Sequence, residues 1–571
     1  MVSISIDGGR AACLCPSICS NLGSNLGGGI SIIAIASTSP FAASRPIRIT
    51  LGINIFRSRL CQVGLPARGK SYISKKLCRY LVWCGFRTQI FNVGNRRRAI
   101  PISPSVVVTA PNSTTHDAKF FDPHNSEAKA IRDQLATDTL EELIAWLKKG
   151  GKVGIHDATN STKERRAMLL ERVAQEKSIR CIFVESICTE GEVLDQNIRM
   201  KLRGPDYLNM DSELAIQDFC KRIRNYEVGY ETISQEEEDN GMGYIKIINV
   251  GKKVIAHNIK GYLASHCVLY LMQMHIKQRT IWISRHGESE YNTEHRIGGD
   301  PPLTARGRQY ASALAQFIQN SHPPIETQDS ITSLDENFGT DAHGCLSVWT
   351  STLRRTIETG DYFDQSACDI KHIKTLNEIN AGIFESMTYE EIERRYPREY
   401  QERQFNKLNY RYPGPGGESY MDVIDRLRPI VIELERMETN VAIITHHVVT
   451  RTLLGYFTGI PLQNMPTLEV PLHVVYCLKP QPYGTELIKY VCDHRQLCLW
   501  SRRHLARHGL NGCQCFVHCC RRLLEWPGFC ETAWTLQHRL LRSPTTDLCN
   551  IFPVGHRYKY DHDTDSFSVI E

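Results

Sequence analysis

Hydrophobic runs alternate with amphipathic stretches through two long parts of the chain. In the first part, apolar positions recur at helical spacing over Ser71–Trp83, Ser126–Lys149 and Thr162–Lys177. Short apolar runs at Lys152–His156 and Ile179–Ser186 have the length and composition of buried strands. Strands that alternate with helices in this way predict an α/β fold built on a mainly parallel sheet.

The strand expected to open this first sheet has an unusual sequence. Structure is expected to begin within Ile47–Val63, but four polar residues interrupt the run: Arg57, Ser58, Arg59 and Gln62. A buried parallel strand normally has a near-continuous apolar sequence. The pattern therefore predicts a poor first strand and weak support for the loop that follows it.

The second part of the chain shows the same alternation. An apolar run at Thr280–Ser284 predicts a strand that ends at Arg285 and His286. The other expected elements are helices near Ala305–Gln319, Thr388–Arg395 and Met421–Arg436, and strands at Leu346–Thr350, Val441–Thr445, Val474–Leu478 and Leu487–Tyr490. This part is predicted to be a second α/β domain.

Segments without periodicity separate and flank the two parts. Residues 99–118 are expected to be a loop insertion, Asn320–Gly344 a long polar loop, and Met272–Arg279 the linker. The predicted organisation is a disordered leader over 1–44, a first domain over 45–275, a second domain over 276–490 and an irregular Cys/Arg/His-rich tail over 491–571.

Composition and charge agree with two globular domains and point to anionic ligands. The 571 residues are 42% hydrophobic and 23% charged, which is ordinary for globular proteins. The net charge is +6, yet no acidic residue occurs between Asp7 and Asp117, while Lys and Arg crowd residues 45–98. Nucleic acid would suit such a stretch, but the phosphate-loop motif inside it favours a nucleotide and a sugar phosphate.

Cysteine use and hydropathy predict a cytoplasmic protein. The 21 cysteines are scattered without regular spacing, as expected for reduced thiols. No apolar run reaches the roughly 20 residues of a membrane span. The leader is acid-poor like a transit peptide but has few positive charges, so a plain disordered leader is preferred. Zinc-ligand spacing is absent from the tail, so no metal site is expected there.

One motif in the first part is typical of nucleotide binding. Residues 64–71 fit G-x-x-x-x-G-K-[ST], and the predicted nucleotide-binding residues are Gly64, Leu65, Pro66, Ala67, Arg68, Gly69, Lys70 and Ser71. In such a loop the backbone surrounds the phosphates, Lys70 neutralises them, and Ser71 holds Mg²⁺. Asp157 follows a predicted strand and is expected to meet the same ion, although a helix N-cap is its alternative role.

A second motif follows the first strand of the second part. Residues 285–290 read Arg-His-Gly-Glu-Ser-Glu, which is how a histidine phosphatase begins. A phosphate-adding module and a phosphate-removing one, in this order, resemble the bifunctional 6-phosphofructo-2-kinase/fructose-2,6-bisphosphatase family. The string Gly-Leu-Pro-Ala-Arg-Gly-Lys resembles that family specifically. The resemblance covers about 430 residues. It implies ATP, fructose 6-phosphate and fructose 2,6-bisphosphate as substrates, Mg²⁺ as the cofactor, and control of glycolysis.

The resemblance also implies the residues that bind the sugar phosphate in the kinase domain. Planar guanidinium groups match phosphate oxygens in pairs, so several cations are expected there. The matching candidates are Arg97, Arg98, Arg132, Thr159, Arg165, Lys201, Arg222 and Tyr226. Arg96 stands where the family usually has tyrosine, and the 99–118 stretch departs from the family's short connection.

For the phosphatase domain, the resemblance implies a phosphohistidine reaction. His286 is the expected nucleophile and Glu378 the expected general acid. Groups that hold the phosphoryl oxygens are expected to be Arg285, Asn292, Arg355 and His446, and contacts to the remaining phosphate to be Tyr389, Arg403, Lys407, Tyr420 and Arg451. His447 stands where the family usually has glutamine.

Two other interpretations compete with a bifunctional enzyme. A disabled kinase module could regulate the phosphatase, and the poor first strand favours this. Alternatively, the second domain could be a broader phosphatase or mutase. Intact Lys70, Ser71 and Asp157 argue against the former, and Tyr389, Arg403 and Lys407 against the latter. Neither nucleic acid nor membrane is expected as a partner, and a homodimer is left open.

Overall fold

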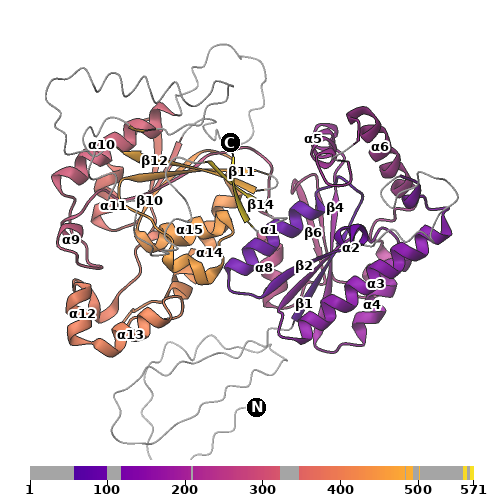
Figure 1. Ribbon diagram of the computed structural model, residues 1–571, viewed down its shortest axis with the longest axis horizontal. Coiled ribbons are helices and arrows are strands. Elements are labelled where there is room, and N and C mark those ends of the chain that lie inside the picture. The colour runs from indigo at the N-terminus through magenta and orange to yellow at the C-terminus, as the bar shows by residue number, and fades with distance from the viewer. Residues whose placement is uncertain are drawn as a thin grey trace, which may run out of the picture. The chain divides into compact units, whose positions relative to one another are not determined.

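Two sheets with flanking helices make up the described part of the protein (Figure 1). The computed structural model describes residues 57–99, 118–207, 210–321, 346–481, 484–492, 500–501, 557–561 and 566–570. The leader, most of the 99–118 insertion, most of the polar loop and most of the tail lie outside these residues. Among the described residues, no helix is long and apolar enough to cross a membrane.

The first sheet has six strands in the order β2-β3-β1-β4-β5-β6. Their bounds are β1 Arg57–Val63, β2 Thr88–Asn92, β3 Val153–Asp157, β4 Ile179–Ile187, β5 Tyr244–Ile248 and β6 Lys253–His257. Neighbouring strands run parallel except β6, which is antiparallel to β5. This arrangement confirms the predicted α/β fold with a mainly parallel sheet.

The prediction of a poor first strand is wrong. β1 lies in the middle of the sheet and pairs with β4 along its whole length and with β3 over Ser58–Cys61. Its polar residues Ser58, Arg59 and Gln62 are buried rather than displaced from the sheet. Backbone pairing on both sides of β1 therefore holds the strand in spite of its side chains.

Helices cover both faces of this sheet. α1 (Lys70–Trp83) and α8 (Tyr262–Leu271) lie on one face, and α3 (Ser126–Lys148) and α4 (Lys163–Ala174) lie on the other (Figure 1). The remaining helices are α2 Val93–Arg98, η1 Ala118–Phe121, α5 Gly191–Leu202, α6 Ser212–Val228 and α7 Gln235–Asp239. The predicted helices match α1, α3 and α4 to within three residues at each end.

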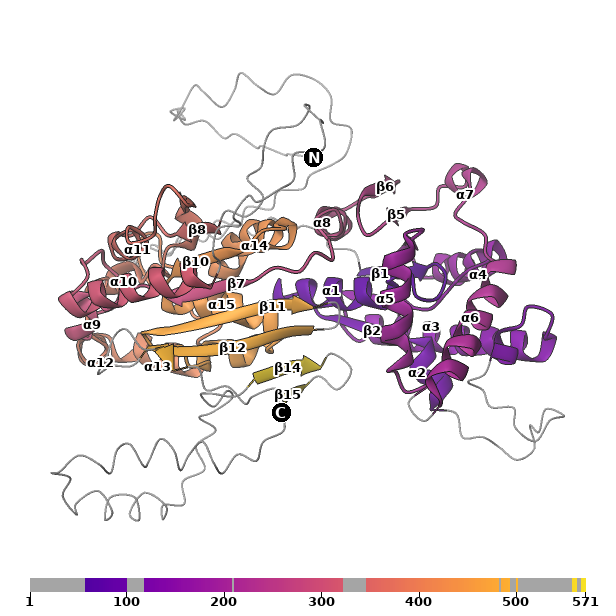
Figure 2. The ribbon, with the colours of Figure 1, turned by 90° about the horizontal axis from the view of Figure 1, so that it is seen from above.

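The second sheet has nine strands in the order β15-β14-β12-β11-β7-β10-β8-β9, with β13 paired to β12. Their bounds are β7 Ile281–Arg285, β8 Leu346–Thr350, β9 Cys368–His372, β10 Val441–Thr445, β11 Val474–Gln481, β12 Gly484–Cys492, β13 Trp500–Ser501, β14 Arg557–Asp561 and β15 Ser566–Ile570. Figure 2 shows β14 beside β12. The last three strands were not predicted, because the tail shows no alternation that marks them.

The helices of the second part pack around this sheet. They are α9 Glu290–Thr293, α10 Ala305–Asn320, α11 Arg354–Gly360, η2 Lys374–Leu376, η3 Gly382–Phe384, α12 Tyr389–Arg395, α13 Pro397–Phe405, α14 Tyr420–Arg436, α15 His447–Thr458 and η4 Leu462–Thr467. The parallel strands β7, β10 and β8 lie side by side, so their carboxyl ends meet at one edge. That edge gathers Arg285, His286 and His446.

A buried ionic cluster ties α1 to α14. The Glu435 carboxylate accepts hydrogen bonds from Lys76 Nζ at 2.7 Å and Arg79 Nη2 at 3.0 Å. Tyr456 on α15 also donates to Glu435, at 2.6 Å. Because α1 begins at the phosphate loop and α15 begins beside His446, the cluster fixes the helices that start at both candidate sites.

Candidate active sites

The phosphate loop joins β1 to α1, as its sequence predicts. The Gly64 N–H donates to Thr159 O at 3.0 Å, and a Cβ at Gly64 would lie 2.6 Å from Ser186 O. Gly64 has a φ of 135°, so a side chain would be both strained and crowded. The loop is thereby held against the carboxyl ends of β3 and β4, where parallel sheets bind ligands.

Lys70 is folded back onto its own loop. Its Nζ donates to Leu65 O at 2.6 Å. Burial lowers the pKa of Lys70 to about 7, against the opposite effect of Asp157, and Lys201 and Arg222 lower it further. Lys70, Asp157, Lys201 and Arg222 are therefore close in space. Burial thus makes the neutral amine of Lys70 far more accessible than that of a solvated lysine.

Ser71 and Asp157 have the chemistry of a Mg²⁺ site. Asp157 ends β3 and is buried, and Ser71 is the second residue of α1. Both offer oxygen donors, which Mg²⁺ prefers. Asn92, at the end of the neighbouring strand β2, donates to Asp157 Oδ2 at 2.6 Å. The residues fit the ion, and Asn92 orients the carboxylate in a way that the sequence analysis missed.

Three of the predicted sugar-phosphate residues share one carboxylate. Asp206 forms ion pairs with Arg97 at 2.6 Å, Arg98 at 3.2 Å and Arg222 at 3.2 Å. Burial alone would raise the pKa of Asp206, but the arginines hold it well below its usual range. The Arg222 guanidinium also lies 3.8 Å from the Phe121 ring centroid. Asp206 thus holds the three arginines together. The sequence analysis did not identify it, because it belongs to no recognised motif.

Two more predicted cations lie beside Tyr226. Tyr226 lies close enough to Arg132 and Arg165 to affect the pKa of both, and burial lowers the pKa of Arg165 to about 10. Tyr226 packs against Phe121, with ring centroids 5.5 Å apart, so this pair borders the arginine cluster around Asp206. The structure thus brings the predicted sugar-phosphate residues together at one end of the sheet.

Arg96, the departure from the family pattern, lies outside this cluster. Its guanidinium pairs with Glu142 at 2.9 Å and Asp138 at 3.8 Å on the outer surface of α3. The side chain is 39% exposed. Arg96 is therefore held by carboxylates of α3 and not by the Asp206 carboxylate that pairs with Arg97 and Arg98.

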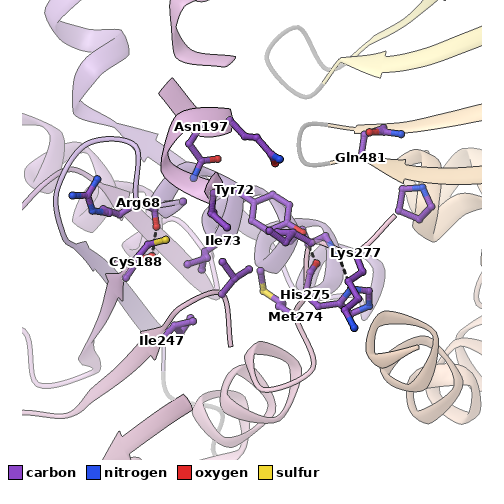
Figure 3. A pocket seen from close by; sticks show the side chains of 18 of the residues that line it. Arg68, Tyr72, Ile73, Cys188, Asn197, Ile247, Met274, His275, Lys277 and Gln481 are labelled. Carbon is purple, nitrogen blue, oxygen red and sulfur yellow. Dashed lines mark hydrogen bonds between the residues drawn. The ribbon is translucent and has the colours of Figure 1, made fainter. Parts of the chain in front are cut away.

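A pocket of about 100 Å³ opens beside the phosphate loop (Figure 3). Arg68 and Gly69 of the loop line it, and its walls include Tyr72, Ile73, Cys188, Val193, Met200, Ile247, Val250 and Met274. Asn197 lines the pocket and donates to Ala67 O at 2.9 Å. The sequence analysis missed these residues, because their apolar side chains look like ordinary core residues.

His286 lies at the carboxyl end of β7 with its reactive nitrogen defined. Its Nδ1 donates to Gly287 O, at 2.7 Å, so Nε2 carries the lone pair. Arg355 Nε donates to that Nε2 at 3.2 Å. Burial lowers the pKa of His286 well below its usual value, and the charges of Arg355 and Arg285 lower it further. The imidazole is therefore neutral and nucleophilic at neutral pH.

The groups predicted to hold the phosphoryl oxygens surround His286. Arg355 donates to Gly299 O at 2.8 Å, and Arg285 donates to Val470 O at 2.9 Å. His446 lies with its ring centroid 5.2 Å from that of His286, and its Nε2 is hydrogen-bonded to Ser351 Oγ at 2.7 Å. Among the described residues, His446 Nδ1 has no hydrogen-bond partner.

Asn292 lies on α9, the short helix that follows the loop carrying His286. Its Oδ1 accepts from the N–H and hydroxyl of Ser289 at 3.0 and 2.9 Å. This cap fixes the amide so that its nitrogen is available as a donor. Ser351 and Ser289 are supporting residues that the sequence analysis did not identify.

Glu378 is held at the start of α15. Its carboxylate accepts from the N–H of Ile379 at 2.9 Å and of Val448 at 3.1 Å. Its charge acts on both Arg285 and Arg355, which places it beside the phosphoryl site. A fixed carboxyl group at this point can exchange a proton with a leaving oxygen or a water.

The residues predicted to bind the remaining phosphate form a second cationic group. Arg403 donates to Tyr389 Oη at 2.9 Å, and Arg451 donates to Tyr420 Oη at 3.0 Å. Burial lowers the pKa of Lys407, and the charges of Arg403 and Arg451 add to this. The same cations act on His447, so this family departure lies between the two groups of positive charge.

Comparisons with known proteins agree with this geometry. The family model for 6-phosphofructo-2-kinase matches residues 55–278, and that for the histidine phosphatase superfamily (branch 1) matches residues 281–333 and 338–493. Together the two matches contain every helix, strand and motif described above between residues 57 and 492. Only the short linker lies between them.

Curated relatives match across both parts. A probable 6-phosphofructo-2-kinase of Schizosaccharomyces pombe is 42% identical, over 76% of this chain and 69% of that protein. 6-phosphofructo-2-kinase 1 of Saccharomyces cerevisiae is 46% identical, over 74% of this chain but only 50% of that protein. 6-phosphofructo-2-kinase/fructose-2,6-bisphosphatase 4 of Rattus norvegicus is 43% identical, over 75% of this chain and 83% of that protein. The chain therefore belongs to the 6-phosphofructo-2-kinase/fructose-2,6-bisphosphatase family.

Proposed function

We propose that this chain both makes and hydrolyses fructose 2,6-bisphosphate, and so regulates glycolysis. The observation that carries the proposal is the presence of two complete constellations in one chain. Lys70, Ser71 and Asp157 form one, and His286, Arg355 and Glu378 form the other. The proposed domains are the kinase over 45–275 and the phosphatase over 276–490.

In the kinase reaction, the loop amides and Lys70 bind the ATP phosphates. Entry of a phosphate frees Lys70 from Leu65 O and favours its protonated form, because the phosphate is anionic. Mg²⁺ held by Ser71 and Asp157 would supply charge neutralisation to the transferred phosphoryl group. The pocket beside Arg68 and Gly69 is proposed to take the adenine ring, since apolar walls there adjoin the phosphate loop.

The acceptor is fructose 6-phosphate, held through its 6-phosphate by the arginines. Arg97, Arg98 and Arg222 offer their guanidinium groups to the phosphate oxygens in exchange for part of their contact with Asp206. Positioning and charge neutralisation then carry most of the catalysis, as in other phosphoryl transfers.

In the phosphatase reaction, His286 Nε2 attacks the phosphorus of the 2-phosphate. Arg285, Arg355 and His446 hold the phosphoryl oxygens while the bond to the sugar breaks. Glu378 gives a proton to the C2 oxygen and then takes one from the water that hydrolyses the phosphohistidine. Arg403, Lys407 and Arg451 hold the 6-phosphate away from the reacting centre.

The finer assignments belong to the same proposal. Mg²⁺ is the proposed metal, the cytoplasm the proposed location, and a homodimer a proposed assembly. Neither nucleic acid nor a membrane has a role in the proposed reactions.

The test of the phosphatase half is to trap its intermediate. The purified chain is incubated with fructose 2,6-bisphosphate labelled in the 2-phosphate and quenched in alkali. We expect an acid-labile phosphoenzyme that the His286→Ala variant lacks. Label retained on that variant would show that another residue is the nucleophile.

A further inference from the structure

The face of β1 that packs against α4 carries a buried guanidinium without a counter-ion. Arg59 is 0% exposed, and its Nη1 reaches Leu169 O at 3.5 Å. Its Nε and Nη2 have no hydrogen-bond partner, and no carboxylate lies within ion-pair distance of it among the described residues. A buried charge without a partner is strongly unfavourable, so a nearby group that ionises would be stabilised.

Two thiols lie beside this guanidinium. Cys61 follows Arg59 by two residues on β1 and therefore points to the same face. Cys181 on β4 is the residue directly across from Arg59 in the strand register. The two sulfur atoms are 3.6 Å apart, and Cys61 is buried whereas Cys181 is partly exposed.

The surroundings of the two thiols differ in a way that assigns each a role. The hydrogen bond that the two thiols share lowers the pKa of Cys181, and the charge of Arg59, which acts on both thiols, lowers it further, against the opposite effect of burial. Burial raises the pKa of Cys61 well above its usual value. Cys181 is thus the more accessible and the more readily ionised of the two thiols, and Cys61 is the buried thiol behind it.

We propose that Cys181 and Cys61 form a peroxide-sensitive thiol pair, with Cys181 as the site of oxidation and Cys61 as the resolving thiol. The Cys181 thiolate attacks one oxygen of a hydroperoxide, the O–O bond breaks, and hydroxide leaves. The sulfur is oxidised to a sulfenic acid and the peroxide is reduced. Cys61 then attacks the Cys181 sulfur, its proton leaves with the hydroxyl group as water, and a disulfide forms.

This oxidation would act on the phosphate loop. Cys61 lies three residues before Gly64, whose backbone is in tight contact with Ser186 on β4. Ser186 Oγ also donates to Arg68 O, inside the loop. A disulfide needs the sulfurs about 2 Å apart, so forming it shifts β1 against β4 at the base of the loop. ATP binding changes as a result, and the phosphatase site on the other sheet does not.

Thiol mapping tests the chemistry without relying on any activity. The full chain is treated with hydrogen peroxide near neutral pH, blocked, digested without reduction and analysed by mass spectrometry. We expect a peptide that links Cys61 to Cys181, which dithiothreitol removes. In the Cys61→Ser variant, dimedone should instead label Cys181 as a sulfenic acid. Absence of both products overturns the proposal.

Matched variants test the consequence. We expect peroxide to lower the kinase activity of the unmodified chain several-fold, reversibly with dithiothreitol, and to leave the phosphatase activity unchanged. Cys181→Ser should resist this loss, whereas Cys220→Ser should not, although Cys220 is also a partly exposed thiol. Arg59→Leu should oxidise several-fold more slowly. Equal loss in the Cys181→Ser and Cys220→Ser variants, or an unchanged oxidation rate in Arg59→Leu, contradicts the assigned roles.

Discussion

The two active sites differ in how their positive charges are held before substrate arrives. In the phosphatase site, Arg285 and Arg355 donate to the neutral carbonyl oxygens of Val470 and Gly299, and the Asp300 carboxylate lies 4.0 Å from Arg355. In the kinase site, Arg97 and Arg222 contact the carboxylate of Asp206 directly. An entering phosphate therefore replaces neutral hydrogen-bond acceptors in the phosphatase site, where the paired carboxylate lies 4.0 Å from Arg355, and competes with a directly bonded carboxylate in the kinase site.

The same contrast holds for the central reactive group of each site. His286 has its tautomer fixed by Gly287 O and is neutral, as a nucleophile must be. Lys70 is bonded to Leu65 O, and burial lowers its pKa to about 7, so it gains its full charge when phosphate binds. The phosphatase site is ready for its reaction, whereas the kinase site is completed by its substrate.

Glu378→Gln tests the phosphatase site and should give the largest of the expected effects. The amide keeps the shape of the side chain but cannot exchange a proton with the C2 oxygen, so kcat should fall by about 10²–10⁴ with little change in KM. Steady-state hydrolysis of fructose 2,6-bisphosphate measures both constants. A normal kcat would place the general acid elsewhere.

Asp206→Asn tests the role of the carboxylate that pairs with the arginines of the kinase site. Three arginines lose a shared partner that is mostly buried, so the free energy of unfolding should fall by about 3 kcal/mol in urea titrations. Inorganic phosphate should stabilise this variant more than the unmodified chain, because it replaces the lost anion. Asp239→Asn, at an exposed site, is the control. If phosphate stabilised the Asp206→Asn variant and the unmodified chain equally, the proposal that phosphate replaces the Asp206 carboxylate would be contradicted.

The pH dependence of ATP binding tests the state of Lys70. The ATP phosphates stabilise the ammonium form, while the free protein loses that proton as pH rises through about 7. Affinity for Mg·ATP should therefore fall above that pH, by at most about tenfold per unit. Calorimetric titration measures it, and Lys70→Met should remove the dependence. A slope that persists in Lys70→Met must come from another group.

Arg96→Tyr restores the family's usual residue and should give the smallest effect. Arg96 pairs with exposed carboxylates on α3, and such pairs contribute about 0–1 kcal/mol. The KM for fructose 6-phosphate should stay within about twofold of the unmodified value. A larger change in KM would show that Arg96 contributes to the binding of fructose 6-phosphate.

The elements that the sequence predicted well are those whose side chains repeat with a clear period. α1, α3, β7 and β10 are examples, and their strand ends carry the predicted motifs. The polar side chains of β1 predict a poor strand with weak support for the phosphate loop, and this prediction is wrong. Its pairing with β3 and β4 is a tertiary property that a local pattern does not contain.

Within the two sites, the sequence predicted the groups that are proposed to contact phosphate, but it did not predict the residues that hydrogen-bond to those groups and hold them in place. Asp206, Asn92 and Ser351 each contact a predicted residue from a distant part of the chain. Their residue types are common at surfaces and in turns, so spacing gave no signal. Asn92 ends β2, a strand that the sequence analysis did not predict, at the edge where parallel sheets bind ligands.

The central claim is that one chain runs both reactions, and the fate of a single label tests it most directly. The unmodified and His286→Ala proteins are each given γ-labelled ATP, Mg²⁺ and fructose 6-phosphate. We expect the variant to accumulate labelled, acid-labile fructose 2,6-bisphosphate, and the unmodified chain to pass the label through phosphohistidine to inorganic phosphate. Lys70→Met should stop both outcomes. If the variant binds ATP and accumulates no labelled sugar bisphosphate, the kinase module is not catalytic and the account of a bifunctional enzyme is contradicted.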